Sequence, residues 1–143
     1  ILLDQFNISS DIFSATSFTE LAKEARTVER ENRLNPSETQ KRSHLQECLP
    51  GEMPIIAATD YVSALPHLVA PYLEARFIAL GTDGFGRSDK RAVLRKFFEV
   101  DSKSIVIAAI EALAKAEIIE YSVLTAALNR YEIDGDTPAP WTI

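Results

Sequence analysis

Three short apolar runs along the chain have the length and composition of β-strands. The runs at 53–60 (MPIIAATD) and 76–81 (RFIALG) are typical of strands buried on both faces of a parallel sheet. The segment 9–17 (SSDIFSATS) mixes β-branched and aromatic residues and predicts a further strand. The period of the apolar residues changes after each of these runs.

Apolar residues three or four positions apart predict amphipathic helices after the strands. Such stripes run through 18–34, 89–99 and 121–131. The stretch 104–117 is apolar on nearly all sides and predicts a buried helix. A strand at 104–110 is the alternative there, but the length of the run and its alanines favour the helix.

Capping residues predict where the first helices begin and end. Ser17 and Glu20 form the pattern of a capping box at the start of 18–34. Residues 1–6 read as the last turns of an amphipathic helix, with Asn7 in the left-handed position that often ends one. The polar segment 36–52 predicts a connection with one helical turn around HLQECL.

Two later helices have less clear starts. Thr59 or Asp60 is expected to cap a helix over 61–73, which Pro66 and Pro71 bend or end. Ser88 or Asp89 is expected to begin the helix at 89–99.

The predicted order of elements is helix, strand, helix, loop, strand, helix, strand and then three helices. This alternation predicts an α/β fold, with helices flanking a doubly wound, mostly parallel sheet in a single domain over 1–143. The chain starts inside a predicted helix and without methionine. We therefore expect it to be a piece of a longer protein.

Composition narrows the class of protein further. With 46% hydrophobic and 25% charged residues the chain is globular in character, and its net charge of −6 argues against a nucleic-acid partner. No apolar run approaches the roughly 20 residues of a membrane helix. Cys48 is the single cysteine, which excludes an internal disulfide. A soluble, cytoplasmic protein is the expectation.

The glycine-rich stretch 81–89 (GTDGFGRSD) is the strongest candidate site, because such turns between a strand and a helix often hold phosphate. Its GFGRSD part lacks the third glycine of a dinucleotide fingerprint, since Asp89 stands there, and the P-loop Lys-Ser/Thr pair is absent. Asp83 and Asp89 would also repel a phosphate. A structural or interface loop is favoured, made of Gly81, Asp83, Phe85, Gly86, Arg87, Ser88 and Asp89.

Side chains in and after this loop have specific predicted roles. Arg87 is expected to pair with Asp83 or Asp89, and Phe85 to be the docking side chain. Basic residues on the following helix predict a solvated face, with docking to an acidic neighbour as the alternative; they are Lys90, Arg91, Arg95 and Lys96.

Other candidates carry weaker signals. His44 and Cys48 have i, i+4 spacing, but a surface histidine and a half-buried cysteine are favoured over an activated nucleophile. A structural role is favoured for His67. The stretch 133–138 (IDGDTP) is too close to the end of the chain for a calcium loop and predicts a turn, with Trp141 anchoring the tail. No catalytic, cofactor-binding or metal-binding residue is predicted.

Several stretches together resemble the C-terminal domain of the homodimeric bacterial pyruvate dehydrogenase decarboxylating component. They are TSFTELA (16–22), ERENRLNP (29–36), ATDY (58–61), GTDGFGRSD (81–89) and FEVD (98–101). The loop motif Gly-x-Asp-x-Phe-Gly-x-Ser is similar to that of the wider transketolase family. The resemblance runs in order along nearly the whole chain, and ERENRLNP favours the pyruvate enzyme over transketolase itself.

The resemblance implies a thiamine diphosphate- and magnesium-dependent enzyme that decarboxylates pyruvate and reductively acetylates the lipoyl group of a dihydrolipoyl acetyltransferase component. In that family the preceding domains bind the cofactor at a homodimer interface. The Gly-Asp-Gly…Asn cofactor signature is absent here, so no cofactor is expected on this chain, which would support domain packing and the dimer. A sheet strand before Ile1 is expected to be missing. The alternative is a module that docks the acetyltransferase core or an effector.

Overall fold

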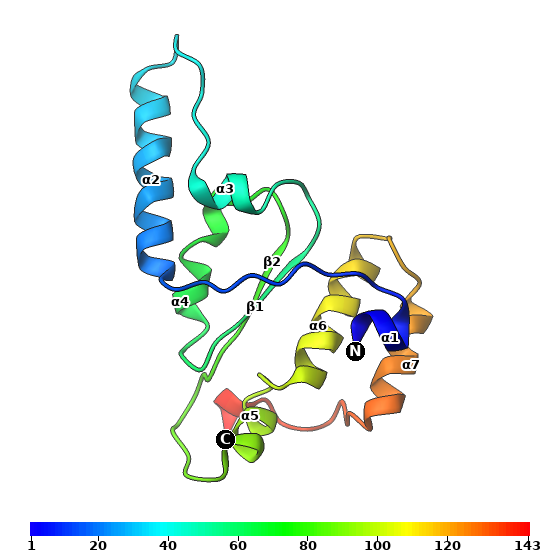
Figure 1. Cartoon of the computed structure of the whole chain (residues 1–143). Coiled ribbons are helices and arrows are strands. Elements are labelled where there is room, and N and C mark those ends of the chain that lie inside the picture. Colours follow the sequence, from blue (N-terminus) through cyan, green and yellow to red (C-terminus); the bar gives the residue numbers. More distant parts are fainter.

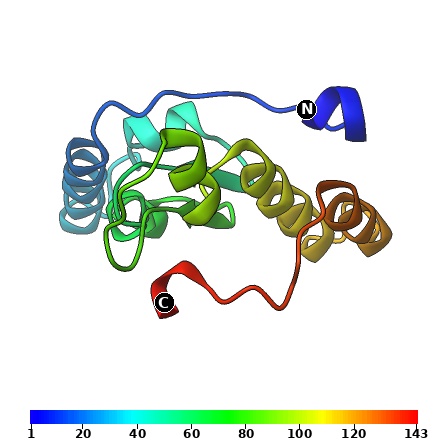
Figure 2. The ribbon, with the colours of Figure 1, turned by 90° about the horizontal axis from the view of Figure 1, so that it is seen from below.

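The computed structural model describes all 143 residues and places a two-stranded parallel sheet between two groups of helices (Figure 1). β1 (Ile55–Ala58) pairs with β2 (Phe77–Leu80), with Ile55 opposite Phe77. On one side of the sheet lie α2 (Phe18–Leu34), α3 (His44–Cys48) and α4 (Ala64–His67); on the other lie α6 (Ser102–Lys115) and α7 (Tyr121–Tyr131), as Figure 2 also shows. This arrangement confirms the predicted α/β class.

Four short elements complete the fold. They are α1 (Leu2–Phe6), the 3-10 turn η1 (Ala70–Tyr72), α5 (Arg91–Phe97) and the 3-10 turn η2 (Pro140–Thr142). The C-terminal tail leaves α7 and returns beneath α6 to end close to α5 (Figure 1).

The predicted strand at 9–17 is wrong. The segment is extended and crosses in front of the sheet between α1 and α2, but it pairs with neither strand (Figure 1). Ile12 is 94% exposed and Phe13 is 60% exposed. A strand requires a partner for its backbone groups, and no adjacent strand in this chain offers one, so strand propensity alone leaves the segment unpaired.

The predicted start of α2 is confirmed in part. The Ser17 hydroxyl accepts a hydrogen bond from the Glu20 N–H at 3.3 Å, as an N-cap does. Glu20 does not return the bond to Ser17 and pairs instead with Lys23. The complete capping box lies at α3, where Ser43 and Gln46 bond reciprocally.

The helix predicted over 61–73 is shorter than expected. It begins after Ser63 without a side-chain cap and is interrupted between α4 and η1. Neither Thr59 nor Asp60 caps it. Pro66 lies inside the first turns and Pro71 at the start of the 3-10 turn, which are the positions where a missing N–H costs little.

A hydrophobic cluster joins α6, α7 and α1. Val106, Ile110 and Ala127 are buried there, and Phe6 packs against the edge of Tyr131 with ring centroids 6.3 Å apart. Asn7 ends α1 in the left-handed conformation, with φ 54°, as predicted. The core of this half therefore positions α6, which in turn contacts β1.

Candidate interface site at the carboxyl end of the sheet

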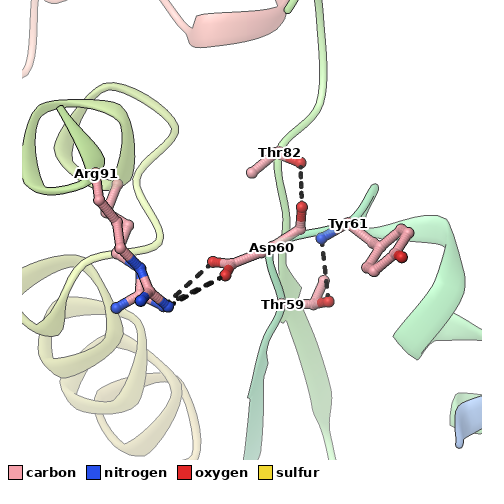
Figure 3. Close-up of polar contacts among 6 residues, drawn as sticks. Thr59, Asp60, Tyr61, Thr82 and Arg91 are labelled. Atoms are coloured by element: carbon pink, nitrogen blue, oxygen red, sulfur yellow. Dashed lines mark hydrogen bonds and ion pairs between the residues drawn. The ribbon is translucent and has the colours of Figure 1, made fainter. Parts of the chain in front are cut away.

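The two loops that follow the parallel strands meet at one edge of the sheet. Because β1 and β2 run in the same direction, residues after Ala58 lie beside residues after Leu80. The Thr82 N–H donates to the Tyr61 carbonyl at 2.8 Å. The Thr82 hydroxyl donates to the Asp60 carbonyl at 3.0 Å (Figure 3). In open α/β sheets this edge is the usual place for a functional site.

Gly81 makes this meeting possible because it has no side chain. A Cβ atom at position 81 would lie 2.7 Å from the Ser63 Cα and 2.7 Å from the Tyr61 carbonyl oxygen. Real Cβ atoms do not approach backbone that closely, so the two loops pack main chain against main chain. Gly81, the first glycine of the motif, is thus required for the two loops to pack this closely.

Asp83 locks the second loop onto the first. Its Oδ1 accepts a hydrogen bond from the Ser63 N–H at 3.0 Å, at the point where α4 begins. A carboxylate at the start of a helix also meets the positive end of the helix dipole. Asp83 therefore has a structural partner within the chain.

Asp60 connects the same edge to α5. Its carboxylate lies 3.3 Å from the Arg95 guanidinium and 3.7 Å from that of Arg91 (Figure 3). Arg91 and Arg95 are one helical turn apart on α5, so both reach one acceptor. Two members of the predicted basic face are therefore neutralised inside the chain, while Lys90 and Lys96 have no acidic partner.

The tip of the 81–89 loop contacts the C-terminal tail on one side only. Gly84 has φ +102°, and a Cβ there would lie 2.9 Å from the Pro140 carbonyl oxygen. A Cβ atom added at Gly86 would meet nothing within 4 Å, and Phe85 is 85% exposed. Ser88 is exposed as well. The tip presents an aromatic ring to its surroundings.

The predicted ion pair of Arg87 is wrong. Its guanidinium carbon lies 4.1 Å from the centroid of the Phe97 ring, a cation–π contact, and forms no ion pair with Asp83 or Asp89. Asp83 instead accepts from Ser63, and Asp89 accepts from the Lys90 N–H at 2.6 Å. The helix begins after Lys90, so neither Ser88 nor Asp89 is its cap residue.

The residues of this loop do not fit a diphosphate. The carboxylates of Asp83 and Asp89 take the backbone N–H groups of Ser63 and Lys90 that an anion would need. The nearest cation in the loop, Arg87, is held on Phe97. No three residues among the histidines, cysteines, aspartates and glutamates gather as metal ligands anywhere in the chain.

The weaker candidates remain separate from this edge. The Cys48 sulfur lies 3.5 Å from Nε2 of His44, but both side chains are on the surface, so the prediction of a half-buried cysteine is wrong. Glu24 accepts from the backbone N–H of His44 and leaves its ring without an orienting carboxylate. Nothing in the pair supplies the base and third group of an activated nucleophile.

His67 has a structural setting. Its Nδ1 lies 2.9 Å from the Ser63 carbonyl oxygen, and its ring meets the edge of Phe77 at 6.0 Å between centroids. Asp134 and Asp136 form the predicted turn, with Oδ1 of Asp134 accepting from the Asp136 N–H. Neither place has the geometry of a catalytic group.

A pocket of about 400 Å³ at the carboxyl end of β2 is the feature that the sequence did not indicate. Leu80 and Phe98 contribute apolar surface, Asp83 and Glu99 contribute carboxylates, and Trp141 contributes an indole ring. These residues come from the 81–89 loop, the end of α5 and the tail. No pattern in the sequence links these positions, because the pocket forms only when the end of β2, the end of α5 and the tail meet.

Comparison with known proteins places this architecture in a family. Residues 1–101 match the family model described as the transketolase-like TK C-terminal domain. The chain belongs to the transketolase-like C-terminal domains. The match contains both strands, the 81–89 loop and α5, which together form the edge described above.

Similarity to complete proteins extends over the whole domain. The chain is 42% identical over 144 residues to the pyruvate dehydrogenase E1 component of Cupriavidus necator. This alignment covers 100% of the chain and 16% of that protein. The E1 components of Pseudomonas aeruginosa and Escherichia coli are 43% and 40% identical, each over 98% of this chain and 16% of the relative. The domain thus spans about 16% of the length of these relatives. No helix in it combines the length and apolarity needed to cross a bilayer.

Proposed function

We propose that the domain is the non-catalytic C-terminal part of a pyruvate dehydrogenase that uses thiamine diphosphate and magnesium. The observation that carries this proposal is the identity of about 40% to E1 components along essentially the whole chain. In this proposal the intact enzyme decarboxylates pyruvate and transfers the acetyl group reductively to lipoyl groups. The other parts of the enzyme bind the cofactor, since the residues of this domain do not fit it.

The contribution of the domain itself is packing. The 81–89 loop is held from within by Gly81 and Asp83, while its tip exposes Phe85. A rigid loop with an exposed aromatic ring is suited to insertion into a neighbouring surface, because its conformation is already fixed before contact. We assign that surface to the preceding domains or to the second subunit of a homodimer.

Calorimetric titration of thiamine diphosphate with Mg²⁺ tests the assignment of the cofactor to other parts of the enzyme. We expect binding heat from the full-length polypeptide and none from this domain alone. A dissociation constant near micromolar for the domain, about 8 kcal/mol of binding free energy, would contradict the proposal and make the glycine loop a phosphate site.

A variant of Phe85 tests the packing role in the full-length enzyme. Phe85→Ala is expected to lower the stability of the dimer, measured as its dissociation constant by sedimentation, or to lower the temperature at which the domains separate. Ile12→Ala is the matched control, because Ile12 is also exposed but lies far from the loop in sequence. Equal effects of the two substitutions would contradict a specific role for the loop.

A second candidate function is docking of the acetyltransferase component or of an effector. The concentration of basic residues from Arg87 to Lys96 in a chain of net charge −6 favours it. Asp60 and Phe97 already engage three of those cations, which leaves a weak positive surface. Binding to the acetyltransferase that weakens steeply with salt and is abolished by Lys90→Gln with Lys96→Gln would support docking over packing.

A further inference from the structure

The pocket at the carboxyl end of β2 combines three chemical features in one place. Its eight lining residues include three apolar ones, two acidic ones and a tryptophan: Ala79, Leu80, Phe98, Asp83, Glu99 and Trp141, with Ser63 and Gly81 as the other two. Its volume of about 400 Å³ is enough for one long side chain. A lining that combines apolar, acidic and aromatic residues suits a cation carried on an aliphatic stem.

The Glu99 carboxylate is available for such a cation. It forms no hydrogen bond or ion pair in the structure and lies on the surface. Its backbone is fixed, because Glu99 follows Phe98, the C-cap of α5, in the left-handed conformation with φ 55° and its N–H donates to the Lys96 carbonyl. The backbone that carries this carboxylate is therefore held in place at the end of the helix.

The Asp83 carboxylate is partly available. Its Oδ1 accepts from the Ser63 N–H, which orients the group, and no cation of the chain pairs with it. Three arginines that follow Asp83 in sequence are engaged elsewhere, Arg87 on the Phe97 ring and Arg91 and Arg95 on Asp60. The chain thus leaves two acidic groups of this pocket without a counter-charge of its own.

Trp141 supplies the third feature. Trp141 is 62% exposed, while the neighbouring Pro140 is buried and its carbonyl faces Gly84. The tail is therefore held by backbone contact at Gly84, and Trp141 is one of the residues that line the pocket. Indole is the aromatic group that attracts cations most strongly, and guanidinium groups also stack on it.

We propose that this pocket receives an arginine side chain from the part of the enzyme that packs against the carboxyl end of the sheet. A metal ion does not suit the site, because hard cations require more oxygen ligands than two carboxylates with one oxygen already occupied provide. Arginine fits better than lysine because its planar guanidinium pairs with carboxylates and stacks on indole at the same time. Only the source of the arginine rests on the proposed function.

The single tryptophan of the chain makes the test direct. Nα-acetyl-argininamide is titrated into the 143-residue protein while Trp141 fluorescence is followed, with the neutral isostere Nα-acetyl-citrullinamide as the control ligand. We expect a saturable change with the arginine compound that weakens as salt is added, and binding of the citrulline compound about tenfold weaker. Equal responses to the two compounds would overturn the proposal. An equal affinity for Nα-acetyl-lysinamide would overturn the choice of arginine.

Variants locate the binding at this pocket. Glu99→Gln and Asp83→Asn are each expected to weaken binding about three- to tenfold, and Asp83→Asn keeps an oxygen that accepts from Ser63. Glu117→Gln is the matched control, because Glu117 is also exposed and left-handed, with φ 57°, but does not line the pocket. Unchanged affinity in both pocket variants, with circular dichroism showing that they fold, would overturn the site.

The outcome is separable from that of the proposed function. The arginine titration needs neither thiamine diphosphate nor the remainder of the enzyme. Failure of the titration overturns the pocket and leaves the calorimetric result standing. Binding of the cofactor to the isolated domain would instead overturn the proposed function and, with it, only the assigned source of the arginine.

Discussion

The backbone of Gly81 packs directly on that of Ser63, so that a Cβ atom at position 81 would lie 2.7 Å from the Ser63 Cα. This contact brings the ends of the two parallel strands together. It also positions Ser63 to donate its N–H to Asp83. The geometry of this edge of the sheet therefore depends on glycine at position 81, where no side chain separates the two backbones.

Gly81→Ala is expected to destabilise the domain by about 1–3 kcal/mol, because backbone must move to admit the methyl group. Gly86→Ala is the control, since nothing lies within 4 Å of the added atom. Its effect is expected to stay within about 0.5 kcal/mol of zero. Urea denaturation of the two variants measures both values, and similar losses in the two would show that the close approach at 81 does not exist.

The ion pairs of Asp60 are expected to contribute modestly to stability. The side chains are exposed, with 60% for Asp60 and 42% for Arg95, so Asp60→Asn should cost about 0.2–1 kcal/mol. A double-mutant cycle with Arg95→Gln isolates the pair, and its coupling energy should fall as salt is raised to about 1 M. A coupling energy that does not change with salt would argue against an ion pair.

Lys41 is expected to give the domain a stability term that disappears at high pH. A hydrogen bond from Lys41 to Glu31, and then the charge of Glu31, raise the pKa of the Lys41 ammonium above its ordinary 10.5. A raised pKa in the folded state stabilises the fold fully below the unfolded value and is lost as pH rises through the folded value. Glu31→Gln should remove this term.

Titration by NMR of the carbon next to the Lys41 nitrogen measures the effect. We expect the Lys41 pKa to fall in Glu31→Gln and to change little in Glu38→Gln, since Glu38 is the smallest of the groups that raise it. The stability difference between the natural protein and Glu31→Gln should shrink above about pH 10.5. A Lys41 pKa that is the same in all three proteins would contradict the assignment.

Gly84 is expected to hold the C-terminal tail in place. Its φ of +102° is unfavourable for other residues, and a Cβ there would lie 2.9 Å from the Pro140 carbonyl oxygen. Gly84→Ala should therefore release the tail and lower the fluorescence anisotropy of Trp141. Gly135→Ala, where nothing lies within 4 Å, should leave the anisotropy unchanged. Loss of anisotropy in both variants would point to a general loosening of the chain end.

Local sequence signals predicted those elements whose ends are marked by capping or breaking residues. Ser17 and Asn7 mark helix ends, and both are confirmed, because a cap acts on backbone within a few residues. The two strands were predicted for a similar reason, as short apolar runs between breakers. The segment 9–17 has the same strand propensity but no neighbour to pair with, and pairing is a property of the fold rather than of the segment.

The candidate site was predicted by its glycines but not by its partners. The loop motif indicated a shaped turn, whereas the contacts of Asp83 with Ser63 and of Arg95 with Asp60 join residues 20 and 35 positions apart. The ion pair predicted for Arg87 from the nearest charges in sequence is wrong, because its guanidinium contacts the ring of Phe97, ten residues later, and neither nearby aspartate. Long-range partners of this kind require the packed structure.

The parallel pairing of β1 with β2 also affects the order in which the chain folds. Ile55 and Phe77 meet across a crossover that contains only α4 and η1, so closing this loop requires little chain entropy. The core around Ile110 is centred on α6 and α7, and partly buried side chains of α1, from the opposite end of the chain, pack against it. The strand–helix–strand unit therefore closes within residues 55–80, whereas covering of the α6–α7 core is complete only when the N-terminal helix packs against it.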